Sequence, residues 1–257
     1  NFLQSWNWGV FQQSLGKKVI RLAWQGEEGQ KIAALAQVVV EKAKRGSYLS
    51  LAGGPLLSWS NQSLVEEVFL HLRSLAKEEG CWFVRFRPQA SLTDGQACLD
   101  DEKVNPGAFA AGKPAAAIDA AALNLISSRQ APMHLTADLT IQLDLTLSEQ
   151  ELLSQMRKNH RQSIRKAESL GITTRISFDE QELKTFYQEQ LSLAQRHNFV
   201  PFSYEFLLKQ FQAFLPDRQV ALIHSELNGQ PLASAFVIFY NHEAVYHYGV
   251  SSSQNQD

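Results

Sequence analysis

The chain has 257 residues, 44% of them hydrophobic and 19% charged, and its formal net charge is −2. These values are ordinary for one large globular domain or two of roughly 120–130 residues, and the near-neutral charge argues against a general nucleic-acid binder. No apolar run approaches the roughly 20 residues of a membrane-spanning helix. Cys81 and Cys98 lack a CxxC spacing and fit a reduced, cytoplasmic setting.

The first half of the chain predicts a helix, three strands, a second helix and a fourth strand. Apolar residues at helical spacing and runs of β-branched and aromatic residues carry this prediction. The third strand breaks at Gly53-Gly54-Pro55, whose backbone amides could meet an anion, although such a sequence is more often a turn alone. The predicted helices are 5–15 and 63–80, and the predicted strands are 17–24, 31–40, 47–57 and 81–87.

A stretch rich in Ala, Gly and Pro follows the fourth strand. We expect residues 95–133 to form a mobile surface segment, of which 115–126 could be helical. Asp94 precedes this segment and could act as an acid or base, although a solvated loop aspartate is the commoner case. The alternating sequence at 135–145 predicts a strand that leads into the next helix.

A basic helix is predicted from Thr146 to Gly171. Ser148 and Glu151 fit the Ser/Thr-x-x-Glu pattern of a helix start, and glycine is a favoured residue after a helix end. The segment RKNHRQSIRK at 157–166 carries five cations and no acid.

Arg157, Arg161 and Arg165 recur at four-residue steps along this helix, and Lys158 lies close to the same face. Like charges at this spacing repel by roughly a few tenths of a kcal/mol per pair, so a bound anion would offset a local cost. Arginine suits phosphate because its planar guanidinium donates two parallel hydrogen bonds. The pattern is compatible with a phosphate-binding face and with a merely solvated basic face.

The second half of the chain repeats the order of elements in the first. Asn228-Gly229 is a strong hairpin signal, and Gly229-Gln230 corresponds to Gly29-Gln30. The predicted helices are 179–198 and 204–215, and the predicted strands are 219–227, 231–240 and 244–250.

We therefore predict an internal duplication, with a first domain at 1–134 and a second at 135–257. The second copy lacks the helix and strand that complete the first, so we expect it to be truncated, with these elements following Asp257.

The chain contains no GxSxG, Walker A, GxGxxG or HExxH motif. His242 and His247 are five residues apart, with no carboxylate or thiol cluster beside them. We therefore predict no metal site and no cofactor.

Several segments together resemble the Fem family, whose members build peptidoglycan cross-bridges from aminoacyl-tRNA. The resemblance covers essentially the whole chain, and its most specific part is the basic helix. The segments are FLQSWNWGVF at 2–11, GGPLL at 53–57, VRFRP at 84–88, LDLTLSEQELLSQMRKNHRQSIRKAESLGI at 143–172, and RHNF and SYEF within 196–206.

The resemblance implies an α/β (α+β) fold of two tandem GNAT-like domains, of the acyl-CoA N-acyltransferase type, with the second domain incomplete. It implies an aminoacyltransferase that moves an amino acid from aminoacyl-tRNA to the stem-peptide amine of UDP-MurNAc-pentapeptide or lipid II. That precursor binds between the two domains in the family. The resemblance also implies a cytoplasmic protein that meets the inner face of the membrane only peripherally, through lipid II.

In the family, an arginine at the position of Arg161 contacts the diphosphate of the precursor. Arg157, Lys158 and Arg165 would assist it or would meet tRNA phosphates.

The sequence departs from the family pattern at two candidate substrate-binding positions. Ser58 stands where an aspartate often follows the Gly-Pro turn, and Phe206 stands where the family has a tyrosine. Tyr248, on the last predicted strand, is a further candidate. A lysine that some members use to stabilise the transferring ester would lie beyond Asp257, so no catalytic residue is assigned within the chain.

Two other functions stay open. The first is a GNAT-like N-acyltransferase that uses acyl-CoA, although the pyrophosphate-binding Q/RxxGxG/A turn has no clean copy here. The second is a non-catalytic RNA- or anion-binding module that uses the basic helix alone.

Overall fold

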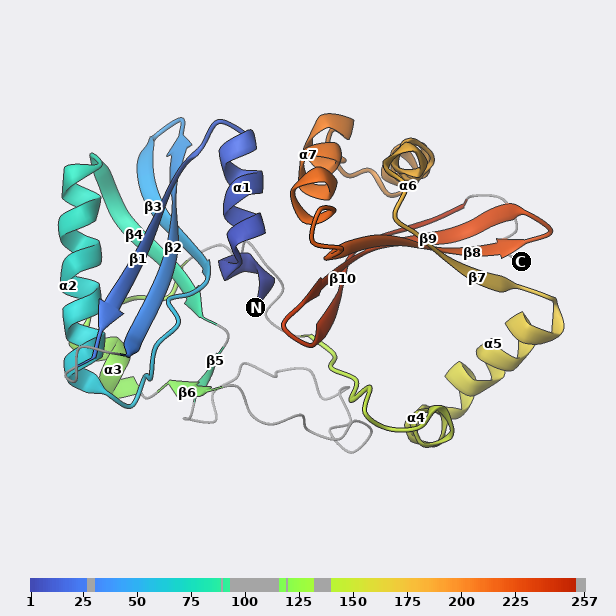
Figure 1. Cartoon of the computed structure of the whole chain (residues 1–257), viewed down its shortest axis with the longest axis horizontal. Helices are drawn as coiled ribbons and strands as arrows, with labels where there is room; N and C mark the ends of the chain where they lie inside the picture. The colour runs from blue at the N-terminus through green and yellow to red at the C-terminus, as the bar shows by residue number, and fades with distance from the viewer. Residues whose placement is uncertain (27–30, 89, 93–115, 119, 132–139, 253–257) are drawn as a thin grey trace. The chain divides into compact units, whose positions relative to one another are not determined.

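The protein is a mixed α/β structure, which confirms the α/β part of the predicted fold (Figure 1). The computed structural model describes residues 1–26, 31–88, 90–92, 116–118, 120–131 and 140–252. Contacts group the chain into two compact units, residues 20–162 and residues 1–19 with 163–257, and each is described by itself. Asp94, Gly29-Gln30 and most of the segment 95–133 lie outside the described residues.

The unit of residues 20–162 is built on a four-stranded sheet in the order β1-β2-β3-β4. β2 and β3 are antiparallel, whereas β3 and β4 are parallel because a helix, α2, connects them. The elements are β1 (Lys18–Gln25), β2 (Ile32–Ala43), β3 (Gly46–Gly53), α2 (Gln62–Glu78) and β4 (Cys81–Pro88).

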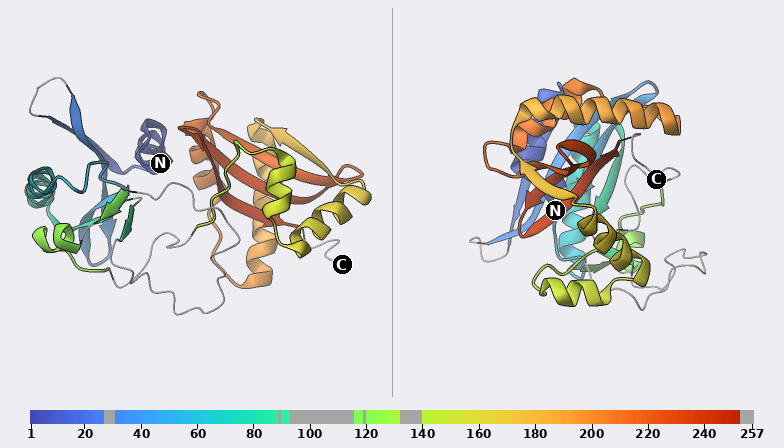
Figure 2. Two further views of the ribbon diagram at one scale, coloured as in Figure 1. Left: turned by 90° about the horizontal axis from the view of Figure 1, so that it is seen from below. Right: turned by 90° about the vertical axis from the view of Figure 1, so that its right-hand side faces the viewer.

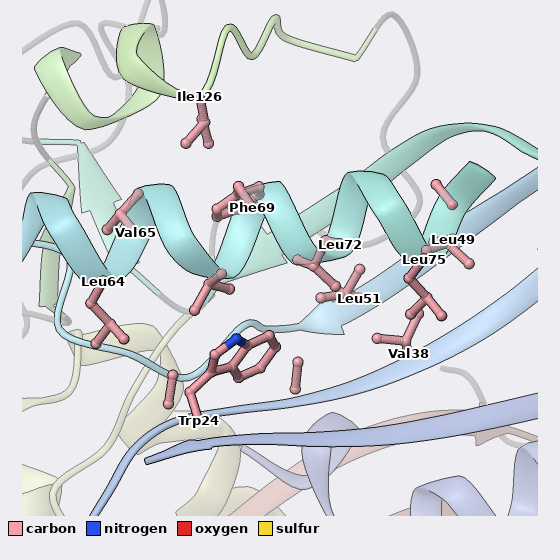
Figure 3. Packing of buried hydrophobic residues seen from close by; sticks show 14 of the residues in the cluster. Trp24, Val38, Leu49, Leu51, Leu64, Val65, Phe69, Leu72, Leu75 and Ile126 are labelled. Carbon is pink, nitrogen blue, oxygen red and sulfur yellow. The ribbon is translucent and has the colours of Figure 1, made fainter. Parts of the chain in front are cut away.

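The core of this unit lies between the sheet and α2. Val65, Val68 and Leu72 recur at three- and four-residue steps on α2 and are completely buried. Trp24 and Leu51 belong to the same core and lie on the sheet facing the helix (Figure 3). The predicted helix at 63–80 is therefore confirmed, and its apolar stripe decides which face of the sheet is covered.

The predicted helix at 115–126 is only partly correct. A short strand, β6 (Ala116–Ile118), comes first and pairs in parallel with β5 (Ala90–Leu92). The helix α3 (Ala120–Leu125) follows. Ile118 and Ile126 at the two ends join the core under α2, and this burial overrides the helical preference of the alanines.

The predicted strand at 135–145 is wrong over its described part. Residues 140–145 form no strand, and residues 132–139 lie outside the description. Ile141, Leu143 and Leu145 are 72%, 51% and 68% exposed. Alternation favours a strand only where another strand offers it hydrogen bonds, and none pairs with 140–145 in the described part of the chain.

The unit of residues 1–19 and 163–257 contains a four-stranded antiparallel sheet in the order β10-β9-β8-β7. Asn228 and Gly229 both have positive φ, 52° and 76°, as the predicted two-residue hairpin requires. β7 was not predicted. The elements are β7 (Thr173–Ser177), η3 (Glu180–Glu182), α6 (Leu183–His197), α7 (Tyr204–Phe214), β8 (Val220–Leu227), β9 (Gln230–Tyr240) and β10 (Glu243–Ser251).

Helices α6 and α7 cover one face of this sheet (Figures 1 and 2). Phe186 of α6 and Phe211 of α7 are completely buried against Phe236 of β9, with ring centroids 6.3 and 5.8 Å from its ring. These aromatic contacts form the centre of the second core.

The first helix, α1 (Trp6–Ser14), packs against α7 and so belongs to this second unit. The Asn7 side chain donates hydrogen bonds to Asp217 (2.8 Å) and Gln219 (3.0 Å). The predicted domains assign α1 to residues 1–134, whereas the contacts group residues 1–19 with 163–257. The order α1, β1, β2, β3 nevertheless recurs as α7, β8, β9, β10.

Replacing Phe11 with alanine should destabilise the unit of residues 1–19 and 163–257. Phe11 is completely buried, and its ring lies 5.1 Å from that of Phe206. We expect a loss of about 3–5 kcal/mol in the free energy of unfolding, as for other buried phenylalanines. This loss can be measured by native-state hydrogen exchange of the β8, β9 and β10 amides.

Trp6→Ala is the matched control, because Trp6 lies on the same helix but is 68% exposed. Unchanged protection of these strands in Phe11→Ala would contradict the placement of α1 in this unit.

Candidate functional site

The predicted basic helix is in fact two helices with different axes (Figure 1). α4 (Glu149–Gln155) begins at the predicted capping box of Ser148 and Glu151, which is confirmed. Met156 then takes an extended conformation, with ψ 151°, and ends α4. α5 (Lys158–Ser169) begins two residues later, so the prediction of one continuous helix is wrong.

The side chain of Arg161 satisfies the carbonyls at this break. Its Nη1 donates to the carbonyl oxygen of Met156 and, at 3.4 Å, to that of Ser154. Carbonyls in the last turn of a helix have no partner within the helix, so they need such a donor. The contacts fix the guanidinium while Nε and Nη2 have no partner among the described residues, which leaves donors for a ligand.

Three further cations surround Arg161 on the same segment. Arg157, Lys158 and Arg165 are exposed, and within the described residues none of their side chains has a hydrogen bond or an ion pair. Arg157 and Lys158 stand at the start of α5, where the helix dipole disfavours positive charge. A bound anion would reduce this repulsion.

Ser58 lies in the unit of residues 20–162, after the cis Gly54-Pro55 peptide. It is exposed, and its Oγ is 2.9 Å from Oγ of Ser60. Its carbonyl accepts from the backbone N–H of Asn61, the residue that caps α2. The hydroxyl can offer a hydrogen bond to a ligand, but it cannot supply the charge of an aspartate.

Phe206 and Tyr248 meet through a third aromatic ring. Phe202 stacks on Phe206 with a centroid distance of 4.6 Å and lies 5.1 Å from Tyr248. The Tyr248 hydroxyl donates to Oε1 of Gln210 at 3.1 Å. Burial raises the pKa of Tyr248, so this hydroxyl stays a neutral donor. Phe202 is 44% exposed and gives the cluster an aromatic surface.

His247 lies beside this cluster, and from the sequence it was considered only as a possible metal ligand together with His242. It is the extra residue of a β-bulge, where the pairing of β10 with β9 shifts between Tyr246 and Tyr248. Its ring packs against Phe2 and Tyr248, with centroids 5.1 and 4.0 Å away, and its Nε2 is buried without a partner in the described part of the chain. Burial lowers the pKa of His247 to about 4. A bulge has no reliable sequence signal, so only the structure shows this.

Comparison with known proteins agrees with this architecture. The fold matches the crystal structure of FemX with a TM-score of 0.77 and 15% identity, covering 100% of this chain and 76% of that one. A sequence model of the FemAB family matches residues 1–228. No protein of curated function matches the sequence significantly. The protein belongs to the FemAB family, which confirms the family resemblance.

Two further findings concern the described residues alone. No helix among them is long and apolar enough to cross a membrane. No group of three or more His, Cys, Asp or Glu side chains among them could hold a metal ion.

The pKa of His247 predicts a loss of stability in acid. The folded-state pKa of about 4 lies below the ordinary value of 6.5, so the unfolded chain takes up the proton first. This contribution to stability is present above pH 6.5 and is lost as pH falls toward about 4. Urea unfolding across this range should show the loss, and His247→Phe should reduce it.

His242→Gln is the control, because His242 is an exposed histidine in the turn that precedes β10. A His247 ring signal that titrates near pH 6.5 in NMR would contradict the prediction.

Proposed function

We propose that the protein is an aminoacyltransferase of cell-wall synthesis. It transfers an amino acid from aminoacyl-tRNA to the stem-peptide amine of a peptidoglycan precursor, either UDP-MurNAc-pentapeptide or lipid II. Membership in the FemAB family supports a transferase role in making peptidoglycan cross-bridges. The observation that carries the proposal is the cationic start of α5, with an arginine already held in place.

The basic segment has the chemistry of a diphosphate site. Arg161 is oriented through Nη1 and can donate from Nε and Nη2, so little side-chain entropy is lost when it binds. Arg157, Lys158 and Arg165 add positive charge around it. Both acceptors in the proposal carry a diphosphate, and the segment would hold that group while the peptide is presented for reaction.

The proposed reaction needs little acid or base chemistry from the protein. The stem-peptide amine attacks the carbonyl carbon of the aminoacyl ester, a C–N bond forms, and the C–O bond to the tRNA ribose breaks. The amine gives up its proton, and the ribose oxygen gains one. Because the ester is already activated, positioning and stabilisation of the developing oxyanion supply most of the rate. The proposal gives no described residue a catalytic role.

The two units support a tandem GNAT-like arrangement. A helix followed by three neighbouring strands occurs twice along the chain, as α1-β1-β2-β3 and as α7-β8-β9-β10, although α1 packs in the same unit as the second set. In this proposal Ser58 and the aromatic cluster of Phe202, Phe206 and Tyr248 contact substrate. Lipid II as the acceptor would bring the protein to the inner face of the membrane.

Removing a cation from the basic segment should weaken binding of UDP-MurNAc-pentapeptide. Arg157→Gln and Arg165→Gln leave the Arg161 contacts to α4 intact, so they test charge without unfolding the break. We expect each to reduce affinity by roughly tenfold, the value of one charge-assisted hydrogen bond. Isothermal titration at two salt concentrations measures the affinities, and the difference should shrink as salt rises.

Lys77→Gln, an exposed cation at the end of α2, is the matched control. Equal affinity in the control, the two variants and the parent would rule out the basic segment as the diphosphate site. Transfer of a labelled amino acid from charged tRNA to the same precursor tests the donor separately.

A further inference from the structure

A row of polar residues crosses the sheet of the unit formed by residues 1–19 and 163–257. Arg175 on β7 lies opposite His224 on β8, which lies opposite Ser234 on β9. His224 and Ser234 are only 3% and 4% exposed. They lie two residues along their strands from Leu222 and Phe236, which belong to the core beneath α6.

Two carboxylates close over this row from one side. Glu182 in η3 and Glu189 in α6 are seven residues apart, which is two helical turns. Oε2 of Glu182 lies 3.0 Å from Nε2 of His224, and Oε2 of Glu189 accepts from Oγ of Ser234 at 3.1 Å. Nδ1 of His224 lies 2.9 Å from the same Ser234 oxygen.

The four groups therefore form one chain in the order Glu182, His224, Ser234, Glu189. The contact of His224 with Glu182 departs from the alignment of a good hydrogen bond, so its effect is mainly electrostatic. A carboxylate oxygen at that distance attracts an N–H and repels a lone pair. The imidazole therefore carries hydrogen on Nε2.

When both glutamates are ionised and His224 is neutral, these four side chains lack one hydrogen for their contacts. Nδ1 of His224 is then an acceptor, and so is the Glu189 carboxylate. The Ser234 hydroxyl lies between them with one hydrogen, so it can satisfy only one of these two acceptors. Glu189 is half-buried, but His224 is buried, so leaving its Nδ1 unsatisfied is costly.

One added proton satisfies every contact. If it sits on Glu189, that carboxyl donates to Ser234, and Ser234 donates to Nδ1 of His224. If it sits on His224, the direction reverses, and Ser234 donates to ionised Glu189. The two arrangements hold the same number of protons and differ only in where the proton lies.

The surrounding charge also favours a proton. Arg175 pairs with Glu182 at 2.9 Å and with Glu226 at 2.8 Å. The groups around His224 and Ser234 thus include three carboxylates, Glu182, Glu189 and Glu226, and a single guanidinium. A proton reduces this excess of negative charge.

We propose that the chain Glu182–His224–Ser234–Glu189 is a buried proton-binding site that holds one shared proton at neutral pH and fastens α6 to the sheet while it does so. The arrangement is a pH-sensitive contact between a helix and the sheet beneath it. It is independent of the proposed transferase function.

The pKa values of the two titrating groups shift in opposite directions. Burial raises the pKa of Glu189, and the hydrogen bond from Ser234 only partly opposes it. Burial also lowers the pKa of His224, against the attraction of Glu182 and Glu226 and with the repulsion of Arg175. Both directions favour a neutral imidazole and a more readily protonated Glu189.

The site makes stability fall as pH rises. In the unfolded chain the imidazole of His224 loses its proton at the ordinary pKa of histidine, about 6.5. The folded chain keeps it to higher pH, so the folded state binds more protons than the unfolded state above that point. Stability is then lost as pH rises from about 6.5 through the apparent pKa of the pair, by up to about tenfold in the folding constant per pH unit.

Glu189→Gln tests the proposal, because glutamine imitates the protonated carboxyl. Its NH₂ donates to Ser234, so the chain keeps all its hydrogen bonds at every pH. We expect the variant to be as stable as the parent at about pH 6.5 and to lack the decline above it, in urea unfolding up to about pH 9. Glu168→Gln, at an exposed position of α5 in the same unit, is the control and should decline like the parent.

Two results would overturn the proposal. The first is a parent stability that does not fall above about pH 6.5 relative to Glu189→Gln. The second, which does not depend on the variant folding well, is a carboxyl carbon-13 shift of Glu189 in the parent that shows full ionisation, with neutral His224, at about pH 7. A protonated Glu189 or a charged His224 at that pH supports it.

Discussion

The constraint on which the structure depends is that each four-stranded sheet has an apolar face that must be covered. In residues 20–162 the cover is α2, and in the other unit it is α6 and α7. Because β3 and β4 are parallel, a helix has to cross the sheet between them, and that helix buries the core. The antiparallel sheet has no such crossing, so its cover comes from helices that precede β8 and from α1.

At the break between α4 and α5, Arg161 both completes the backbone hydrogen bonding and offers charge to a ligand. Carbonyls exposed at the end of α4 require a donor, and Arg161 supplies it from one turn into α5. The same contacts limit the rotamers of the guanidinium, so the residue that completes the backbone is also the one best prepared to bind an anion. A lysine could not do both, because it lacks the planar set of five donors.

Residue spacing and turn residues in the sequence correctly predicted the helices that bury one apolar face and the hairpin of the second sheet. The spacing of Val65, Val68 and Leu72 and the Asn228-Gly229 turn both had direct sequence signals. Residues 140–145 did not follow the local pattern because they lack a pairing strand among the described residues, and at Met156 the side chain of Arg161 takes the carbonyls that a continuous helix would use. The family and the basic segment were also accessible from sequence. The row of Arg175, His224 and Ser234 was not, since its members come from three strands and meet carboxylates on a helix.

The packing of α1 on α7 sets the order in which the chain can fold during synthesis. Asn7 bonds to Asp217, 210 residues later, and Phe11 packs against Phe206. At about 5–20 residues per second, the ribosome needs roughly 10–40 s to make that interval. Phe2 and Phe11 emerge before Phe206 and stay uncovered until it is made, while residues 20–162 can already collapse on α2. Such a delayed, sequence-distant contact slows folding and leaves a nascent apolar segment that chaperones can bind.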